Sequence, residues 1–483
     1  MGKGKFNEQS SIDYYKVSKE IISYWNSNNI FEKSISSRSE DKIFPFYEGP
    51  PSANGMPGIH HVMARTIKDI FCRYKTLKGY RVYRKGGWDT HGLPVELQVE
   101  KNLGITKDDI GNKISVEKYN EECKVAVMQF KEAWEELTES IGYWLDIDDA
   151  YITFKNNYIE SIWWSLKELY KKGLLYKGYT IQPYSPAAGT GLSSHELNMP
   201  GAYKNIKDTS LTAQFKIQKN KKSQEIIGDS DCYFLAWTTT PWTLPANNGL
   251  AVGEKIKYNL IETFNKYTES KINVIIAEKC IEKFFDSNNL KTSEELIFDK
   301  QNLPYKILKT FKGKDLIGFD YDQLLPYVKA EKPAFTVVSG DFVTTDEGTG
   351  IVHISLTFGS DDFYVSKKNN LPGIFVKNDK NEDVPIVDKS GKFVKEIIDF
   401  AGLQVKAFSD VEGLTTDEQI SIKLKKENKA FDVKKYEHSY PHCWRTDKPI
   451  LYYPLESWFI NSTKLKDDFI NKNKDINWQP EST

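Results

Sequence analysis

Apolar and polar positions along the first two hundred residues predict alternating helices and strands. Apolar residues recur three or four positions apart over 12–32, which predicts an opening helix. A short apolar run at 43–47 predicts a buried strand, and Gly49-Pro50-Pro51-Ser52-Ala53-Asn54-Gly55 follows as a rigid turn. The other elements expected here are a helix at 58–78, a strand at 81–83, and helices at 93–101, 115–142 and 156–172. This order favours an α/β fold with a parallel sheet.

The predicted helix at 58–78 carries an apolar stripe made of Met63, Ile67, Ile70, Tyr74 and Leu77. After residue 200 the pattern changes to short β-rich runs separated by polar turns, which indicates a different domain. The strands expected there are at 210–217, 232–238, 272–277, 335–339 and 350–355. Aromatic and proline-rich sequence returns at 436–460.

The composition is typical of a soluble globular protein. Of 483 residues, 39% are hydrophobic and 28% are charged, with a net charge of -1, which excludes disordered and collagen-like chains and predicts about two to four domains. No apolar run approaches the roughly 18 residues of a membrane span, and no signal-peptide core or myristoylation motif opens the chain. We therefore expect a cytoplasmic protein with no membrane partner. Five scattered cysteines indicate reduced thiols.

The first candidate motif is Gly58-Ile59-His60-His61, which follows the Pro-Pro turn at the predicted start of a helix. Free N–H groups and the positive helix end attract phosphate there, and glycine lets a nucleotide approach the backbone. His60 and His61 can donate hydrogen bonds to developing negative charge. The alternative is a pair of capping or packed histidines.

The second candidate comprises Asp89 and His91 in Gly87-Trp88-Asp89-Thr90-His91-Gly92-Leu93-Pro94. A carboxylate at the end of a strand lies where open α/β sheets bind ligands, and it can hold an ammonium group. Otherwise Asp89 is a turn or cap residue. Nearby, residues 73–85 contain six cations and no acid, which predicts either contact with a phosphate backbone or a solvated face.

The third candidate is a threonine-rich segment, Trp237-Thr238-Thr239-Thr240-Pro241-Trp242-Thr243-Leu244-Pro245-Ala246-Asn247. A hundred residues later come Gly348-Thr349-Gly350-Ile351-Val352-His353 and Asp361-Asp362. Three adjacent hydroxyl groups can hold a sugar, a terminal base or a water molecule. Each feature alone has a structural explanation, as a strand face, a structural histidine or a loop pair, but their joint occurrence favours a functional site.

Several other signatures are missing from the sequence. No Gly-x-Gly-x-x-Gly follows the first strand and no Gly-x-x-x-x-Gly-Lys-Ser/Thr occurs, so dehydrogenase and P-loop functions lose their main support. There is no Cys-x-x-Cys, and His438, His442 and Cys443 lack the partner pair of a closed zinc site.

Taken together, these segments closely resemble the isoleucyl-tRNA synthetase family of class I aminoacyl-tRNA synthetases over essentially the full length. Residues 46–55 and 87–96 match the active-site segments of the family, and 237–247 and 348–362 match its editing segments. Valyl and leucyl relatives normally carry an arginine after the paired threonines, where this chain has Thr240-Pro241-Trp242. The resemblance therefore favours isoleucine.

The resemblance implies a Rossmann-like catalytic domain interrupted by a β-rich editing domain. Residues 1–202 would form an N-terminal helix and the first catalytic half, 203–430 the inserted editing domain, and 431–483 a return segment. The implied partners are isoleucine, ATP with Mg²⁺, and tRNA(Ile), with the protein a monomer. Isoleucine is larger than valine by one methylene, which gives a binding pocket only about 1–3 kcal/mol of discrimination. The resemblance therefore implies a second site that hydrolyses valyl-tRNA, and this family is the established example of that argument.

The matching positions also assign roles to individual residues. In editing, the threonines would hold the tRNA terminus or a water, His353 would exclude isoleucine, and Asp362 would bind the ammonium group of valine. No protein nucleophile is implied. The full implied set is His60 and His61 for catalysis; Asn54, Gly55, Gly58 and His61 for ATP; Gly49, Pro50, Pro51, Asp89, His91 and Trp458 for isoleucine; and Thr238, Thr239, Thr240, Asn247, His353 and Asp362 for editing.

The chain also departs from the family pattern. Gly58-Ile59-His60-His61 replaces His-Ile-Gly-His, so a phosphate-binding role is better supported for His61 than for His60. Of the cysteines that often bind zinc in the family, only Cys443 remains, which predicts no structural zinc. The family usually has a proline after His-Thr-Ala, and this proline is replaced in 353–357. The resemblance therefore does not determine the backbone conformation of this segment.

The sequence also lacks a Lys-Met-Ser-Lys-Ser loop, the second nucleotide-fold half and an anticodon-binding domain. We therefore expect a fragment that shows little isoleucine-dependent pyrophosphate exchange while keeping its editing hydrolysis. The alternatives are a valyl- or leucyl-tRNA synthetase and a synthetase-like, non-catalytic tRNA-binding module.

Overall fold

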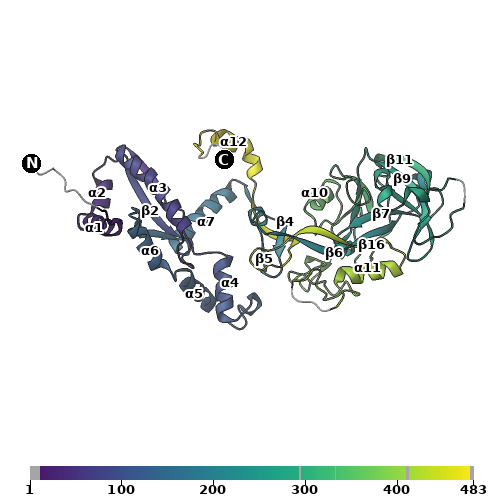
Figure 1. Cartoon of the computed structure of the whole chain (residues 1–483), viewed down its shortest axis with the longest axis horizontal. Helices are drawn as coiled ribbons and strands as arrows, with labels where there is room; N and C mark the ends of the chain where they lie inside the picture. The colour runs from purple at the N-terminus through teal and green to yellow at the C-terminus, as the bar shows by residue number, and fades with distance from the viewer. Residues whose placement is uncertain (1–10, 293–294, 332, 409–412, 479–483) are drawn as a thin grey trace, which may run out of the picture. The chain divides into compact units, whose positions relative to one another are not determined.

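The computed structural model describes residues 11–292, 295–331, 333–408 and 413–478. The chain divides into two compact units, which we call the first unit (Met1–Tyr176 with Ile460–Thr483) and the second unit (Lys177–Phe459). Figure 1 labels the elements of both. The domain boundaries after residues 202 and 430 stay a prediction.

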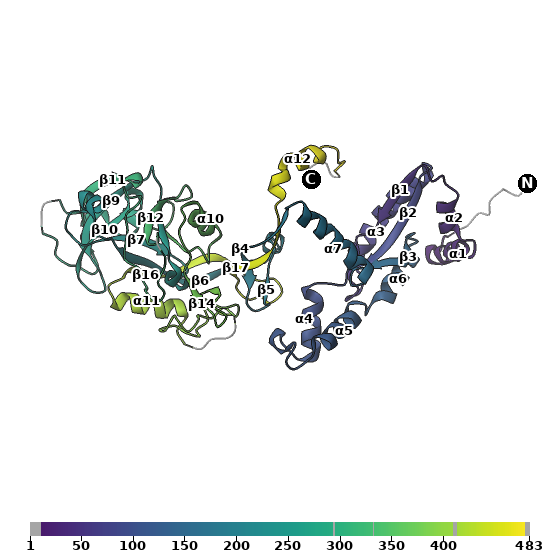
Figure 2. The same ribbon diagram turned by 180° about the vertical axis from the view of Figure 1, so that it is seen from behind.

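The first unit contains a three-stranded parallel sheet in the order β1 (Ile43–Tyr47), β2 (Arg81–Trp88), β3 (Asp146–Ile152). Helix α3 (Ile59–Leu77) connects β1 to β2 and lies beside them in Figures 1 and 2. The predicted α/β class with a parallel sheet is confirmed. Because parallel strands end at the same edge, the segments that follow all three strands meet there.

Two long predicted helices are each divided in the structure. The prediction at 12–32 becomes α1 (Tyr14–Ser27) and α2 (Ile30–Ser36), because Asn29 between them takes a left-handed conformation with φ of 50°. The prediction at 115–142 becomes α5 (Val116–Val127) and α6 (Lys131–Ser140). The break lies where the Phe130 N–H donates to the Ala53 carbonyl oxygen at 2.9 Å. The other helices of this unit are α4 (Leu93–Leu103), α7 (Asn156–Lys171) and α12 (Lys466–Asn473).

One burial prediction for the first unit is wrong, and the apolar stripe of α3 faces outward. The strand at 43–47 is not buried, since Ile43 and Tyr47 are exposed on β1, which is an edge strand. The apolar stripe of α3 is exposed along its whole length, and Arg65, Cys72 and Thr76 form the buried face instead. On this buried face, the guanidinium of Arg65 lies 5.1 Å from the Trp134 ring centroid.

The second unit is rich in β-structure. Its largest sheet has the order β11-β9-β10-β7-β6-β16, and a smaller sheet has the order β12-β8-β13. Apolar side chains from both sheets form one extended core. The strands are β4 (Leu175–Ser185), β5 (Thr190–Gly191), β6 (Tyr203–Lys216), β7 (Cys232–Thr238), β8 (Gly249–Val252), β9 (Lys257–Phe264), β10 (Lys271–Ala277), β11 (Lys306–Lys312), β12 (Thr336–Ser339), β13 (Ile351–Ile354), β14 (Phe375–Lys377), β15 (Asp383–Pro385), β16 (Ala430–Pro441) and β17 (Leu451–Ile460).

The helices of the second unit are short. They are α8 (Ser194–Leu197), α9 (Lys221–Ile227), α10 (Ser360–Lys368) and α11 (Thr416–Lys426), with a 3₁₀ helix at Pro241–Ala246. Five predicted strands correspond to β6, β7, β10, β12 and β13. In the largest sheet, β9, β11 and β16 were not predicted, because their charged positions hide the alternation.

A long antiparallel ribbon joins segments that are far apart in the sequence. Strand β6 pairs with β16 from Tyr203 opposite Pro441 to Ala213 opposite Ala430. Figure 1 shows the two strands side by side. Across the described parts of the chain, no helix is both long and apolar enough to span a membrane.

Candidate functional site

The first two sequence motifs meet at the carboxyl edge of the parallel sheet. The N–H of Asp89, directly after β2, donates to the carbonyl oxygen of Pro51 in the turn after β1 at 3.0 Å. Thr90 and His91 both contact the Thr153 hydroxyl directly after β3, at 2.8 and 2.9 Å. This edge is where open α/β sheets bind ligands.

His61 is held in one orientation at the start of α3. The Gly58 N–H donates to His61 Nδ1 at 2.9 Å, which leaves Nε2 as the protonated nitrogen of the neutral ring. Burial, His60 and Arg65 lower the pKa of His61, so the ring is neutral at pH 7. His61 can therefore donate one hydrogen bond from Nε2 without carrying a charge.

A cavity of about 410 Å³ lies beside His61 in the first unit. Of the residues predicted for this site, those that line it are Gly49, Pro51, Asn54, Gly55 and His61. Those that do not line it are Pro50, Gly58, His60, Asp89 and His91. His60 is exposed, with its ring centroid 3.7 Å from that of His61. Trp458 lies exposed on β17 of the second unit. The roles of all these residues stay predictions.

Two cationic residues beside His61 were not predicted from the sequence. Arg65 and Lys68 line the same cavity, and Lys68 Nζ lies 2.7 Å from Oε1 of the buried Glu48. Tyr143 donates to the other Glu48 oxygen. The signal was present, because His61, Arg65 and Lys68 are four and three residues apart and so share one helix face. The cavity combines one neutral donor, two cations and the carboxylate of Glu48, and this net positive charge suits a polyphosphate.

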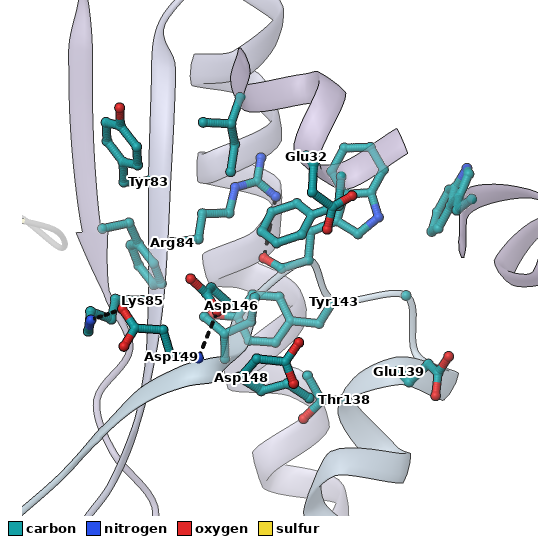
Figure 3. Close-up of a pocket in the computed structure, with 18 of the residues that line it drawn as sticks. Glu32, Tyr83, Arg84, Lys85, Thr138, Glu139, Tyr143, Asp146, Asp148 and Asp149 are labelled. Atoms are coloured by element: carbon teal, nitrogen blue, oxygen red, sulfur yellow. Dashed lines mark hydrogen bonds and ion pairs between the residues drawn. The ribbon is translucent and has the colours of Figure 1, made fainter. Parts of the chain in front are cut away.

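A larger cavity, of about 930 Å³, lies elsewhere in the first unit and is lined by none of the residues predicted for catalysis or for binding ATP or isoleucine (Figure 3). Arg84 enters it from β2, and its side chain is fully buried, 2.9 Å from the Thr76 hydroxyl and 3.4 Å from Asp69. Lys85 is paired with Asp149 at 2.5 Å. Arg84 is thus committed to packing, and residues 73–85 do not form a continuous basic stripe for nucleic acid.

The second unit brings the threonine segment, His353 and Asp362 into one cavity of about 320 Å³. The threonines come from the end of β7, His353 from β13 and Asp362 from the first turn of α10. Thr238 and Thr240 bond to each other through their hydroxyls at 3.2 Å. The Thr239 hydroxyl makes no hydrogen bond within the described residues, which leaves it available to a ligand.

His353 is fixed by hydrogen bonds at both ring nitrogens. Asn247 Nδ2 donates to His353 Nδ1 at 2.8 Å, so Nε2 carries the proton and donates to the Thr243 hydroxyl at 3.0 Å. Thr243 in turn donates to the Thr240 carbonyl oxygen at 2.9 Å. Burial lowers the pKa of His353 to about 3, so the ring stays neutral. His353 therefore forms a rigid wall and is not an acid or base.

Tyr321 sets the direction of this chain of hydrogen bonds. Its hydroxyl donates to Asn247 Oδ1 at 2.7 Å, which turns the Asn247 amino group toward His353. Asn247 is buried behind His353 and does not line the cavity. Sequence reasoning missed Tyr321, because nothing in its neighbourhood marks it and it lies 74 positions from Asn247.

We expect Tyr321→Phe to lower the free energy of unfolding by about 1–3 kcal/mol, because it leaves a buried amide oxygen without a donor. Urea denaturation followed by tryptophan fluorescence measures the change. Tyr305→Phe is the matched control, since Tyr305 is buried and its hydroxyl bonds to none of the described residues. Equal stability of the two variants would contradict the assigned role.

Asp362 presents a partly buried carboxyl group to the same cavity. The Ser355 N–H donates to its Oδ2 at 2.9 Å. Burial raises the pKa of Asp362 to about 7, although that hydrogen bond lowers it. A Cβ at Gly359 would lie 2.5 Å from Asp362 Oδ2, so a larger residue there would displace this carboxyl group. An ammonium group in the cavity would supply the countercharge that this carboxyl lacks.

Cys443 lies in the second unit, where the family often has zinc ligands. Burial raises the pKa of its thiol, but the neighbouring Thr446 and Ser185 and two backbone N–H groups lower the pKa overall. The Ser185 hydroxyl also accepts from the Ala188 N–H at 3.2 Å. Within the described ranges, no three His, Cys, Asp or Glu side chains gather as a metal site. The absence of structural zinc stays a prediction.

A family model for tRNA synthetases class I (I, L, M and V) matches residues 20–483. The chain belongs to this family. The isoleucine–tRNA ligase of Cytophaga hutchinsonii is 58% identical over 99% of this chain and 44% of its own length. That of Bacteroides fragilis is 52% identical with the same coverage. This class I chain thus spans less than half the length of these relatives.

Among solved structures, the editing domain of the P. knowlesi cytosolic leucyl-tRNA synthetase matches 35% of this chain and 66% of its own. The identity is 15% and the TM-score 0.27, a likeness too distant to carry an argument. The assignment to class I synthetases rests on the sequence match.

Proposed function

We propose that this chain belongs to an isoleucine–tRNA ligase that, as a whole, activates isoleucine with ATP and transfers it to tRNA(Ile), and that the chain itself hydrolyses valyl-tRNA(Ile) at a second site. The observation that carries the proposal is the cavity of the second unit, where three threonines, a neutral histidine and a carboxyl group from three separate segments converge. Its volume of about 320 Å³ is within the range of small-molecule sites. The relatives named isoleucine–tRNA ligases support isoleucine as the amino acid.

In the proposed hydrolysis, water attacks the ester carbonyl carbon and the bond to the ribose oxygen breaks. Asp362 holds the ammonium group of valine, and the Thr239 hydroxyl is available to the ribose or the water. His353 acts by its position, since both ring nitrogens are occupied. A pocket closed by a fixed ring admits valine and excludes the larger isoleucine. Isoleucyl enzymes are the established example of such size discrimination at a second site.

For the first reaction, the carboxylate of isoleucine attacks the α-phosphate of ATP and pyrophosphate leaves. The residues beside the 410 Å³ cavity fit ATP, because His61 Nε2 offers a donor at the start of α3, and Arg65 and Lys68 further along the helix add positive charge. Asp89 is the candidate for the ammonium group of isoleucine. Mg²⁺ commonly binds through substrate phosphates, and we assign it no protein ligand.

The test is deacylation of valyl-tRNA(Ile) by the purified 483-residue chain. We expect release of valine above the uncatalysed rate and little release of isoleucine from isoleucyl-tRNA(Ile). Thr239→Val removes the available hydroxyl, nearly preserves the shape, and serves as the matched variant. Valine release no faster than in buffer alone would show that the editing proposal is wrong.

A further inference from the structure

A buried cluster of charges lies behind the threonine segment, outside the cavity itself. Lys406 Nζ is 2.6 Å from Asp208 Oδ2 and 3.2 Å from Asp417 Oδ2. Lys406 and Asp417 are 9% and 4% exposed, so this is an interior ion pair. His438 Nε2 lies 3.0 Å from Asp208 Oδ2 on the adjacent strand of the ribbon. Nothing in the proposed chemistry uses these groups.

The cluster reaches the threonine segment through one hydrogen bond. Asp417 Oδ1 accepts from the backbone N–H of Trp242 at 2.9 Å. Pro241 has no N–H, so the Trp242 N–H is the first donor of the 3₁₀ helix that directly follows Thr240. Helix-start donors have no partner within the helix, and here the partner is a carboxylate on α11.

Charge balance makes this acceptor possible inside the protein. A single buried carboxylate is costly unless a cation compensates it. Lys406 contacts both carboxylates, and although burial lowers its pKa, Asp417, Tyr440 and Asp208 raise the pKa overall, so Lys406 stays charged. Removing Lys406 would leave two carboxylates facing each other. The hydrogen bond from the Trp242 N–H to Asp417 therefore depends on Lys406 as well as on Asp417.

We propose that Asp417, balanced by Lys406, is a positioning residue that fixes Thr239 and Thr240 in the geometry needed for hydrolysis. The inference rests on the proposed editing function and deepens it. Asp417 fixes the backbone just after the threonines, and the Thr243 hydroxyl fixes the Thr240 carbonyl oxygen. Asp417 holds the threonine segment from outside the cavity, since neither Asp417 nor Trp242 lines it, whereas Thr243 lines the cavity itself.

The test compares Asp417→Ala and Asp417→Asn in the full 483-residue chain. Hydrogen–deuterium exchange of the peptide 239–246 reports the Trp242 amide directly. We expect at least tenfold faster exchange in D417A and exchange within threefold of the parent in D417N, since an amide oxygen still accepts the hydrogen bond. For valyl-tRNA deacylation we expect kcat to fall about tenfold in D417A, with KM nearly unchanged and most of the rate restored in D417N.

Asp432→Asn is the matched control. Asp432 forms a half-buried ion pair with Lys266 and contacts none of the threonines. It should leave the 239–246 exchange and the deacylation rate unchanged. If D417A does not fold, as judged by circular dichroism, Lys406→Met gives the same test and should also speed exchange and lower kcat. Parental exchange and kcat in a folded D417A or K406M would overturn the proposal.

The two proposals can fail separately. If the parent chain does not release valine, the editing function is wrong, and the role in hydrolysis proposed for Asp417 falls with it. If the parent releases valine but folded D417A matches it in exchange and rate, only the positioning role is overturned. Equal exchange in D417A and D432N would assign the cluster to general stability alone.

Discussion

Asp362→Asn is expected to lower valyl-tRNA hydrolysis by at least about 30-fold, because truncating one partner of a buried charge pair costs roughly 2 kcal/mol or more. The variant keeps the size of the side chain and an oxygen for the Ser355 N–H. It removes the negative charge that would hold the ammonium group of valine. Deacylation under single-turnover conditions measures the effect. An unchanged rate would show that Asp362 does not hold the ammonium group of valine.

The same substitution is expected to stabilise the protein at pH 8. The pKa of Asp362 is about 7 in the folded protein, against an ordinary value of 3.8 for an aspartate in the unfolded chain. Between these values the folded state binds more protons, so the contribution of Asp362 to stability is present below pH 4 and is lost as pH rises through 7. The Tm of D362N should exceed that of the parent above pH 7 and approach it below pH 4.

Asp361→Asn is the matched control for both measurements. Asp361 is the neighbouring carboxyl group, and it is exposed and does not line the cavity. We expect neither its deacylation rate nor the pH dependence of its Tm to differ from the parent. If D362N loses activity and gains stability while D361N does neither, the carboxyl group of Asp362 lowers the stability of the fold and is needed for binding.

His353→Ala is expected to make the second site hydrolyse isoleucyl-tRNA(Ile). The ring occupies its place as a fixed wall, so removing it opens space for the extra methylene of isoleucine. We expect isoleucine release to rise by about 10- to 200-fold, the range that one methylene can discriminate. Deacylation of isoleucyl-tRNA(Ile) measures it, with the exposed His195→Ala as control.

The neutrality of His353 adds a second criterion to this experiment. With its pKa lowered to about 3, the ring does not titrate between pH 5 and 8. The ratio of valine to isoleucine release by the parent should therefore stay constant across that range. A ratio that changes near pH 6.5, or a H353A variant that still spares isoleucine, would contradict the assigned role.

The sequence predicted the local parts of both sites. The Pro-Pro turn, His61 at a helix start and the threonine run are contiguous, so their chemistry could be read from neighbouring residues. Arg65 and Lys68 were readable in principle from helical spacing with His61. Tyr321 and Asp417 were not, because they act on residues 74 and 175 positions away, and only the folded chain brings them together.

Burial was the least predictable property. The stripe on α3 obeys helical periodicity, yet periodicity only shows that a helix has an apolar face and does not say what that face contacts. Arg65 instead lies on the buried face against Trp134, and its guanidinium is compatible with the interior because aromatic rings, a hydroxyl and the charge of Glu48 compensate it. Such compensation depends on residues from other elements.

The ribbon formed by β6 and β16 has a consequence for synthesis on the ribosome. Residues 211–216 of β6 find a partner in β7 almost at once, but Tyr203 to Ser210 pair only with β16. At roughly 5–20 residues per second, that edge waits about 10–50 seconds for its partner to be translated. During this interval the nascent chain exposes an open strand edge, which makes the ribbon a natural point of engagement for chaperones and of misassembly between neighbouring polysomal chains.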